Sequence, residues 1–356
     1  MHIPQSHWLM IKRSLLWPFF IALFIHQAAA VTMSQPFPLS IEDHLEQQYS
    51  SQIEPFWQNN VVNGSFNGVN GVKIEYAYLL NPDATGTVVI SSGRIETLLK
   101  YKELAFDLYQ NGYSVFIHDH RGQGLSGRMI PEAQRGYVEN FDDYVQDLKQ
   151  FYSQVVQPHS SHQPKLLCHS MGGAIGALYL LSYPDDFAAA AFSSPMFGIK
   201  SPLPDWLGEP LISSGLAVNG LFSDKNWYFI GQTDYLAVPF AVNTLTHSKI
   251  RYKIFRQVYE DNPQAKLGGV TFKWLDQAIS AMDNIKLRAS QIQTPSLVLQ
   301  AGSDKVVDNA SQDQVCDKMP QCAKIGIDGA NHELLMEKDS YRIPVMNHIL
   351  AFFQSH

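Results

Sequence analysis

Residues 165–183 read KLLCHSMGGAIGALYLLSY, and this stretch decides the fold. Residues 165–168 form a short apolar strand pattern, and residues 172–183 form a helical pattern rich in small residues. A nucleophile elbow has this order: a strand, a sharp turn with a serine at its tip, and a helix. Ser170 stands at the tip, with Gly172 two positions later and Cys168 where glycine is usual. A serine that only caps a helix can show the same small residues around it. The prediction of an elbow therefore depends on the strand before Ser170 and the helix after it.

Strand and helix patterns alternate on both sides of this motif. The predicted strands are 87–91, 114–118, 188–193, 296–300 and 323–327, and further helices are predicted at 98–108, at 141–151 and before the C-terminus. Such alternation predicts an α/β fold in which helices cover both faces of a mostly parallel sheet. Ligands then lie at the carboxyl ends of the strands, so we expect the chemistry in the loops that follow strands.

The alternation breaks from residue 195 to about residue 285. That stretch is rich in Trp, Phe, Pro and Leu and holds three of the six tryptophans, but it shows no clear strand pattern. We therefore predict an inserted helical cap at 195–285, between core segments 31–194 and 286–356. The end of the polar stretch 31–70 is rich in Gly and Asn and predicts hairpin turns.

Composition excludes several classes of protein. The 356 residues are 45% apolar and 17% charged, which suits a large core and excludes a disordered chain. The formal net charge of −7 argues against a nucleic-acid partner, because such binders carry a basic excess. Outside the N-terminus there is no long apolar run, so the chain does not span a membrane several times.

The N-terminus has the pattern of a secretory signal peptide. Lys12 and Arg13 precede the apolar run 15–25, and three alanines follow at 28–30. We therefore expect residues 1–30 to direct export to the periplasm or beyond. An uncleaved anchor that leaves the protein membrane-associated is the alternative.

The cysteines Cys168, Cys316 and Cys322 are too few for a disulfide scaffold and lack metal-ligand spacing. In an exported chain, Cys316 and Cys322 are either disulfide-bonded or two free thiols. The sequence predicts no metal site and no cofactor.

A nucleophilic serine needs a base, and an acid that orients the base. Asp304 follows the predicted strand 296–300, and His332 follows the predicted strand 323–327. The chain order Ser170, Asp304, His332 is the order that an elbow of this kind requires. We therefore predict these three as catalytic, with Asp308 and Asp328 as alternative acids.

Two backbone N–H groups are predicted to form an oxyanion hole, which stabilises negative charge on the reacting oxygen. Met171, directly after the nucleophile, supplies one. Arg94 supplies the other, because it follows Gly93 in the loop after the strand 87–91. The Arg94 guanidinium is a candidate for contact with a lipid phosphate, and a structural ion pair is the alternative.

Several motifs resemble one family. Residues 119–128, DHRGQGLSGR, resemble a block of the monoacylglycerol-lipase branch of the α/β-hydrolases. Further segments resemble the PldB-type bacterial lysophospholipases: SGRIE at 92–96, NFDDYV at 140–145, SPMFGI at 194–199, TLTHS at 244–248, GGVT at 268–271 and VVDN at 306–309. The resemblance covers about 45–356 and implies an α/β-hydrolase fold with Ser170, Asp304 and His332 at the triad positions. Asp119 and Arg121 would brace the loop beside the elbow.

The chain departs from the family at two places: Ser92 precedes Gly93 where the lipase branch has His, and Cys168 replaces Gly. Neither change removes a catalytic group. The resemblance implies a serine hydrolase that cleaves the acyl ester of lysophospholipids. A monoacylglycerol lipase or broad esterase, a peptidase and a non-catalytic lipid-binding protein are the alternatives.

An enzyme of this kind would contact membrane surfaces or lipid aggregates transiently. The aromatic cap residues are candidates for the lining of the acyl site, and packing in the core of the cap is the alternative for each: Trp206, Phe222, Trp227, Tyr228, Phe229 and Phe240.

Overall fold

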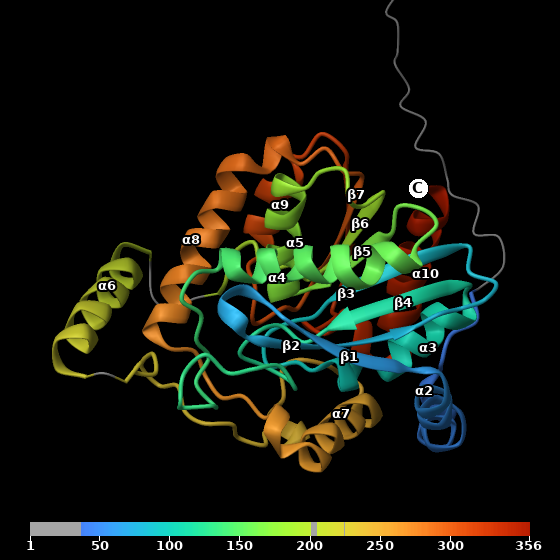
Figure 1. Ribbon diagram of the computed structural model, residues 1–356, viewed down its shortest axis with the longest axis horizontal. Helices are drawn as coiled ribbons and strands as arrows, with labels where there is room; N and C mark the ends of the chain where they lie inside the picture. Colours follow the sequence, from blue (N-terminus) through green and yellow to red (C-terminus); the bar gives the residue numbers. More distant parts are fainter. Residues whose placement is uncertain (1–36, 201–204, 224) are drawn as a thin grey trace, which may run out of the picture. The chain divides into compact units, whose positions relative to one another are not determined.

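The computed structural model describes residues 37–200, 205–223 and 225–356, so the predicted signal peptide lies outside the described residues. In the described part, one eight-stranded sheet has the order β1-β2-β4-β3-β5-β6-β7-β8 (Figure 1). The strands are β1 Val62–Asn67, β2 Lys73–Leu79, β3 Gly86–Ser91, β4 Tyr113–His118, β5 Lys165–His169, β6 Ala189–Ser193, β7 Ser296–Ala301 and β8 Cys322–Ile327. β1 and β2 form the predicted hairpin and are antiparallel to their neighbours, whereas β3 to β8 run parallel.

Helices cover both faces of the sheet, which confirms the predicted α/β-hydrolase architecture (Figure 1). The α-helices are α1 Glu42–Gln48, α2 Glu54–Asn60, α3 Lys102–Gln110, α4 Asp142–Phe151, α5 Met171–Ser182, α6 Asp205–Phe222, α7 Lys249–Asp261, α8 Phe272–Arg288, α9 Asn309–Cys316 and α10 Asp339–Ser355. Short 3-10 turns are η2 Val69–Gly71, η3 Leu98–Tyr101, η5 Gln157–His159, η6 Phe240–Val242, η7 Pro263–Ala265, η8 Ala289–Gln291 and η9 Leu334–Met336, and π turns are η1 Tyr49–Ile53 and η4 Tyr152–Val156.

Alternate residues of each parallel strand contribute to two different cores. On β3, Val89 packs in the core beneath α4, α5 and α8, while Val88 and Ile90 pack in the core beneath α3 and α10. Because both faces are covered, the central strands are buried along their whole length and read as continuous apolar runs.

The segment between β6 and β7 contains α6, α7 and α8, but these helices differ in their packing. Ala278, Met282 and Ile285 of α8 share a core with Ile175 of α5, so α8 belongs to the helical layer of the sheet. α6 lies at the outer side of α8, where Gly215 contacts the Phe272 ring (Figure 1). The segment outside the layers of the sheet therefore ends before α8, whereas the predicted cap extended to residue 285 and included most of this helix.

Two further features concern the cysteines and the membrane. Cys316 and Cys322 form a disulfide that joins the end of α9 to the start of β8, and Cys168 is a buried free thiol. Within the described ranges, no helix has both the length and the apolar character that crossing a membrane requires.

Candidate active site

Ser170 lies at a sharp turn between β5 and α5. Its backbone has φ 50° and ψ −116°, a conformation that costs a non-glycine residue on the order of 1–3 kcal/mol. Three backbone hydrogen bonds hold the turn: Ser170 N–H donates to the carbonyl of Ser193 at 3.1 Å, and the Ser170 carbonyl accepts from Gly173 and Met196. The turn thus holds the serine at the carboxyl end of the sheet, as the sequence predicts for an elbow.

Close packing around the turn explains its small residues. A Cβ atom on Gly172 would lie 2.0 Å from the carbonyl oxygen of Ser91, so only glycine lets α5 approach the loop after β3. A Cβ on Gly176 would lie 2.4 Å from the Cys168 sulfur. Gly176 therefore leaves the space that the Cys168 thiol occupies, which explains how this elbow accommodates cysteine where glycine is usual.

We predict that Gly172→Ala distorts the elbow. Because the added Cβ meets backbone rather than a flexible side chain, the helix or the loop must shift, at a cost of about 1–3 kcal/mol in unfolding free energy. Chemical denaturation and ester hydrolysis should both report a loss. Gly326→Ala on β8 is the matched control, because its Cβ would have no described atom within 4 Å. Equal stability of the two variants would contradict this account of the elbow.

The structure brings Ser170, Asp304 and His332 together from three loops that follow strands. His332 Nε2 lies 2.9 Å from Ser170 Oγ, and His332 Nδ1 lies 2.7 Å from Asp304 Oδ2. All three side chains are buried. The arrangement can move a proton from the serine hydroxyl to the imidazole while the carboxylate fixes the ring.

The second oxygen of Asp304 is also held. Oδ1 accepts hydrogen bonds from the backbone N–H groups of Val306 at 2.7 Å and Val307 at 3.0 Å. Burial alone would raise the pKa of Asp304, but the hydrogen bond to His332 and the backbone donors hold this pKa below its ordinary value. Asp304 is therefore a carboxylate at neutral pH.

The two alternative acids have other environments. Asp308 caps α9 by accepting from Ser311 N–H at 2.8 Å, and Asp328 is exposed in the turn after β8. Asp304 alone of these three acids contacts the imidazole.

The predicted oxyanion donors both lie beside the elbow. Met171 is the first residue of α5, so no preceding helical turn offers a carbonyl to its N–H. Arg94 directly follows Gly93, whose own N–H donates to the carboxylate of Glu96. In the described part of the chain, Arg94 N–H has no acceptor.

A buried charged cluster fixes the Gly93–Arg94 loop to the loop of His332. Lys100 Nζ donates to Glu96 and, at 2.8 Å, to both carboxylate oxygens of Glu333, the neighbour of His332. Burial alone would raise the pKa of Glu96, but Lys100 holds it at about 2. His169 Nε2 lies 3.6 Å from Glu333, and burial lowers the pKa of His169. Glu96, His169 and Glu333 are close enough to hold a cation, but the Lys100 ammonium already binds both carboxylates.

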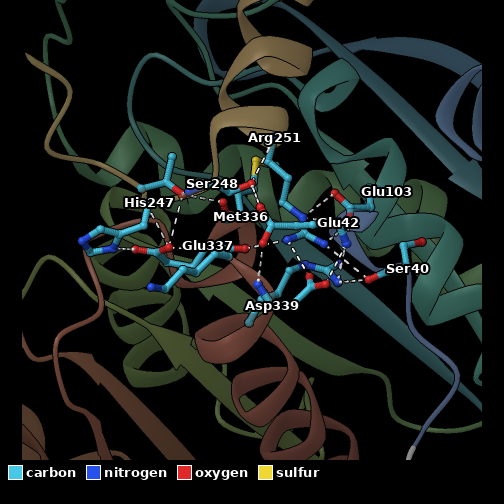
Figure 2. Close-up of polar contacts among 12 residues, drawn as sticks. Ser40, Glu42, Glu103, His247, Ser248, Arg251, Met336, Glu337 and Asp339 are labelled. Carbon is cyan, nitrogen blue, oxygen red and sulfur yellow. Dashed lines mark hydrogen bonds and ion pairs between the residues drawn. The ribbon is translucent and has the colours of Figure 1, made fainter. Parts of the chain in front are cut away.

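A second network fixes the His332 loop from the side of the insertion. Residues 243–248, which we call the strap, lie between η6 and α7. The Glu337 carboxylate accepts from the backbone N–H of His247 at 3.0 Å, from His247 Nδ1 at 2.7 Å and from Asn331 N–H at 3.0 Å. Arg251 of α7 donates to the Glu337 carbonyl at 2.7 Å, as Figure 2 shows. The strap and α7 are thereby joined to the residue that precedes His332.

Glu337→Gln is expected to lower kcat and stability together. The amide cannot accept at both positions, so Asn331 or His247 loses a hydrogen bond to a buried charge, which costs about 1.5–3 kcal/mol. Thermal unfolding and steady-state kinetics measure the two effects. His247→Ala, at a half-exposed position, keeps the backbone bond and removes only the contacts of the ring to Glu337 and to the Asn331 amide, so it should cost less. A Glu337→Gln variant with wild-type kcat would show that the network does not position His332.

The loop after β4 is held by Asp119 and Arg121, the two residues to which the family resemblance assigns this role. Arg121 pairs with Asp147 at 2.7 Å and Asp143 at 3.0 Å. Asp119 accepts from the backbone N–H groups of Leu98 and Leu125. Both side chains are buried, so they hold the loop after β4 in place.

Ser170 and His332 open into a cavity of about 520 Å³. Apolar side chains from the sheet edge and from the insertion form much of its wall, and they include Met196, Ile199, Leu236, Val238, Leu245, Phe255, Leu267 and Trp274. The described aromatic candidates for the lining lie elsewhere. Phe222, Trp227, Tyr228, Phe229 and Phe240 do not line this cavity, and the side chain of Trp206 lies outside the described residues. The insertion, the segment between β6 and α8, does line the cavity, but with residues such as Leu236, Val238 and Phe255.

Comparison with known proteins agrees with this geometry. Residues 82–339 match the family described as serine aminopeptidase, S33. The chain is 38% identical to lysophospholipase L2 of Escherichia coli over 85% of this chain and 90% of that protein, and 33% identical to a probable lysophospholipase L2 of Haemophilus influenzae over 87% and 97%. The crystal structure of the Paleococcus ferrophilus monoacylglycerol lipase shares the fold, with a TM-score of 0.61 and 17% identity over 78% of this chain and 98% of that one. The chain belongs to the serine aminopeptidase S33 family of α/β-hydrolases and, within it, to the lysophospholipase L2 family.

Proposed function

We propose that this protein is a serine hydrolase that cleaves the fatty-acyl ester of lysophospholipids through an acyl-enzyme on Ser170. The observation that carries the proposal is the hydrogen-bonded chain Ser170–His332–Asp304 at an apolar cavity. The similarity to lysophospholipase L2 supports the choice of substrate.

The reaction needs only groups of this chain. His332 Nε2 accepts the proton of Ser170 Oγ as the oxygen attacks the ester carbonyl. The N–H groups of Arg94 and Met171 stabilise the negative charge on the carbonyl oxygen. His332 then gives the proton to the departing glycerophospho alcohol. Water, activated by the same imidazole, releases the fatty acid and restores the serine.

The cavity suits one acyl chain. Its volume of about 520 Å³ lies within the range of about 300–1,000 Å³ that small-molecule sites occupy. Each CH₂ group that moves from water to its apolar wall contributes about 0.8 kcal/mol. Long acyl esters should therefore be preferred over acetyl esters.

The charges of the cavity favour a lipid ester over a peptide. Binding a peptide's N-terminal amine needs a free carboxylate, but Glu96 and Glu333 are both bound to Lys100. Asp234 at the rim accepts a hydrogen bond from the Tyr228 hydroxyl. Two arginines, Arg94 and Arg256, face the same cavity and would repel an amine.

An apolar surface of the insertion supports contact with lipid aggregates. Several large apolar side chains between residues 218 and 242 are exposed, and they are Val218, Leu221, Phe222, Trp227, Ile230, Leu236, Val238 and Val242. Exposed apolar side chains of this kind are typical of sites of membrane or protein contact. We propose that these side chains meet lipid.

We further propose that residues 1–30 direct the export of the protein. N-terminal sequencing of protein from its native host should begin near Val31, whereas an intact N-terminus would point to a membrane anchor.

A substrate panel tests the proposed reaction. The purified protein is given lysophosphatidylethanolamine, lysophosphatidylcholine, a monoacylglycerol with the same acyl chain, p-nitrophenyl esters from acetate to palmitate, and aminoacyl p-nitroanilides. We expect the highest kcat/KM on a lysophospholipid, rising activity with ester chain length and no amide cleavage. Activity that falls steadily beyond butyrate would leave a short-chain esterase, and preference for monoacylglycerol would assign the alternative lipase activity.

A further inference from the structure

Arg94 is a partly buried arginine whose partners differ from those of the fully buried arginines of this protein. Arg121, Arg251 and Arg342 each contact carboxylates, at distances of 2.6 to 2.9 Å for their shortest ion pairs. Arg94, in contrast, makes no ion pair with any described residue. The alternative left open by the sequence, that its guanidinium serves a structural ion pair, therefore finds no support among the described residues.

The guanidinium of Arg94 is held by neutral groups. Its Nη2 donates to the carbonyl of Gly268 at 2.6 Å, and it lies 5.2 Å from the ring centroid of Trp274. A Cβ on Gly136 would lie 2.8 Å from Nη2, so glycine there makes room for the side chain. Nε is buried and has no hydrogen-bond partner among the described residues. Burial lowers the pKa of Arg94 to about 10, so the group still carries its charge at neutral pH.

Arg256 of α7 faces the same cavity from the insertion. Its Nη1 and Nη2 donate to the hydroxyls of Tyr235 and Tyr252, each at 2.9 Å, and its Nε is also buried without a described partner. It stacks on the rings of Tyr252 and Phe255 at 5.1 and 5.4 Å. As with Arg94, its described contacts include no carboxylate.

We propose that Arg94, assisted by Arg256, binds the phosphodiester of the substrate's head group. This inference rests on the proposed lysophospholipase function and names the feature by which the site would recognise a phospholipid. A charge buried without a counter-ion is unfavourable, and a phosphate that forms hydrogen bonds with it removes that cost.

The position of Arg94 in the chain gives the phosphate a defined place. The Arg94 N–H is the proposed oxyanion donor, so its side chain starts beside the ester carbonyl. In a lysophospholipid, the glycerol links that ester to the phosphate by a chain comparable in length to an arginine side chain. With the carbonyl at the N–H, the phosphate can reach the guanidinium that lines the same cavity.

Because the other charged side chains of the cavity are paired, the two arginines are the groups that can donate hydrogen bonds to an anion. Lys100 is bound to Glu96 and Glu333, and Asp234 is bound to Tyr228. A monoacylglycerol has no phosphate and gains nothing from either arginine. The two arginines would therefore determine the preference between lysophospholipid and monoacylglycerol.

The kinetic test measures this preference within each variant. We compare kcat/KM for lysophosphatidylethanolamine with kcat/KM for the monoacylglycerol of the same acyl chain, so that any general damage to the site cancels in the ratio. Arg94→Gln should lower the ratio by about tenfold or more, because a charge-assisted hydrogen bond is lost. Arg256→Gln should lower it less, since two of its N–H groups already bind hydroxyls.

Arg135→Gln is the matched control. Arg135 also donates to one carbonyl, that of Asn226 at 2.6 Å, and also stacks on an aromatic ring, that of Tyr228, but it does not line the cavity. Its ratio should equal that of the wild type. An unchanged ratio in Arg94→Gln, or an equal fall in Arg135→Gln, would overturn the proposal.

A binding measurement separates this inference from the proposed function. Calorimetry on Ser170→Ala protein with glycerophosphoethanolamine as the ligand needs no turnover. We expect binding that the double variant Ser170→Ala/Arg94→Gln loses. No difference between the two proteins would overturn the phosphate site even if the enzyme hydrolyses lysophospholipids. If the wild type hydrolyses no lysophospholipid, the proposed function fails, and this binding result decides the site by itself.

Discussion

Ser170→Ala is expected to abolish acyl-ester hydrolysis and to leave the fold intact. Only the Oγ atom is lost, and with it one hydrogen bond to His332. Without this oxygen no acyl-enzyme can form, so kcat should fall by a factor on the order of 10⁴–10⁶. Fatty-acid release and thermal unfolding of the purified variant measure the two expectations. More than trace hydrolysis by a correctly folded variant would show that another group is the nucleophile.

Asp304→Asn is expected to lower kcat on the order of 10⁴-fold. The Oδ1 position can still accept from Val306 and Val307, so the loop is retained. The amide N–H₂ group then faces His332 Nδ1, which favours the tautomer with its proton on Nε2. That tautomer cannot take the proton from Ser170. Turnover of a p-nitrophenyl ester measures the loss.

Two neighbouring acids serve as controls for this variant. Asp308→Asn changes the cap of α9, and Asp328→Asn changes an exposed turn, so neither touches the imidazole. Both variants should keep most of the activity. A larger loss in Asp308→Asn than in Asp304→Asn would move the orienting acid to Asp308.

The fold and the three central side chains were predictable because their signals are local. Ser170, Asp304 and His332 each lie in a loop after a strand that the apolar pattern marks, and parallel strands bring such loops to one edge of the sheet. The small residues around the elbow also predicted the close packing there. A Cβ on Gly172 would meet the backbone of Ser91, and a Cβ on Gly176 would meet the Cys168 thiol.

The supporting residues were not predictable, because their partners lie far apart in the chain. Lys100 is 233 residues from Glu333, and His247 is 90 residues from Glu337. Nothing in the local pattern indicates that charges at these positions are buried together. Lys100 lies within the predicted helix 98–108, but its burial, which requires a carboxylate opposite, is visible only in the structure.

Three other differences have similar causes. The helical stretch that contains α1 and α2 was missed because it is mostly polar, with only a few positions such as Leu45, Ile53 and Trp57 buried. The predicted cap boundary at residue 285 falls inside α8, which shares a core with α5, because α8 follows a long segment without strands. The state of Cys316 and Cys322 depends on their Cα separation, 5.5 Å, which a spacing of six residues does not determine.

Labelling with a fluorophosphonate probe shows whether Ser170 is the nucleophile. The probe forms a stable bond with an activated serine, so mass spectrometry of the digested protein identifies the nucleophile. We expect one adduct, on the peptide that contains Ser170, and loss of labelling in Ser170→Ala and in His332→Ala. No adduct on the folded protein, or an adduct on a different serine, would contradict the claim that Ser170 forms the acyl-enzyme.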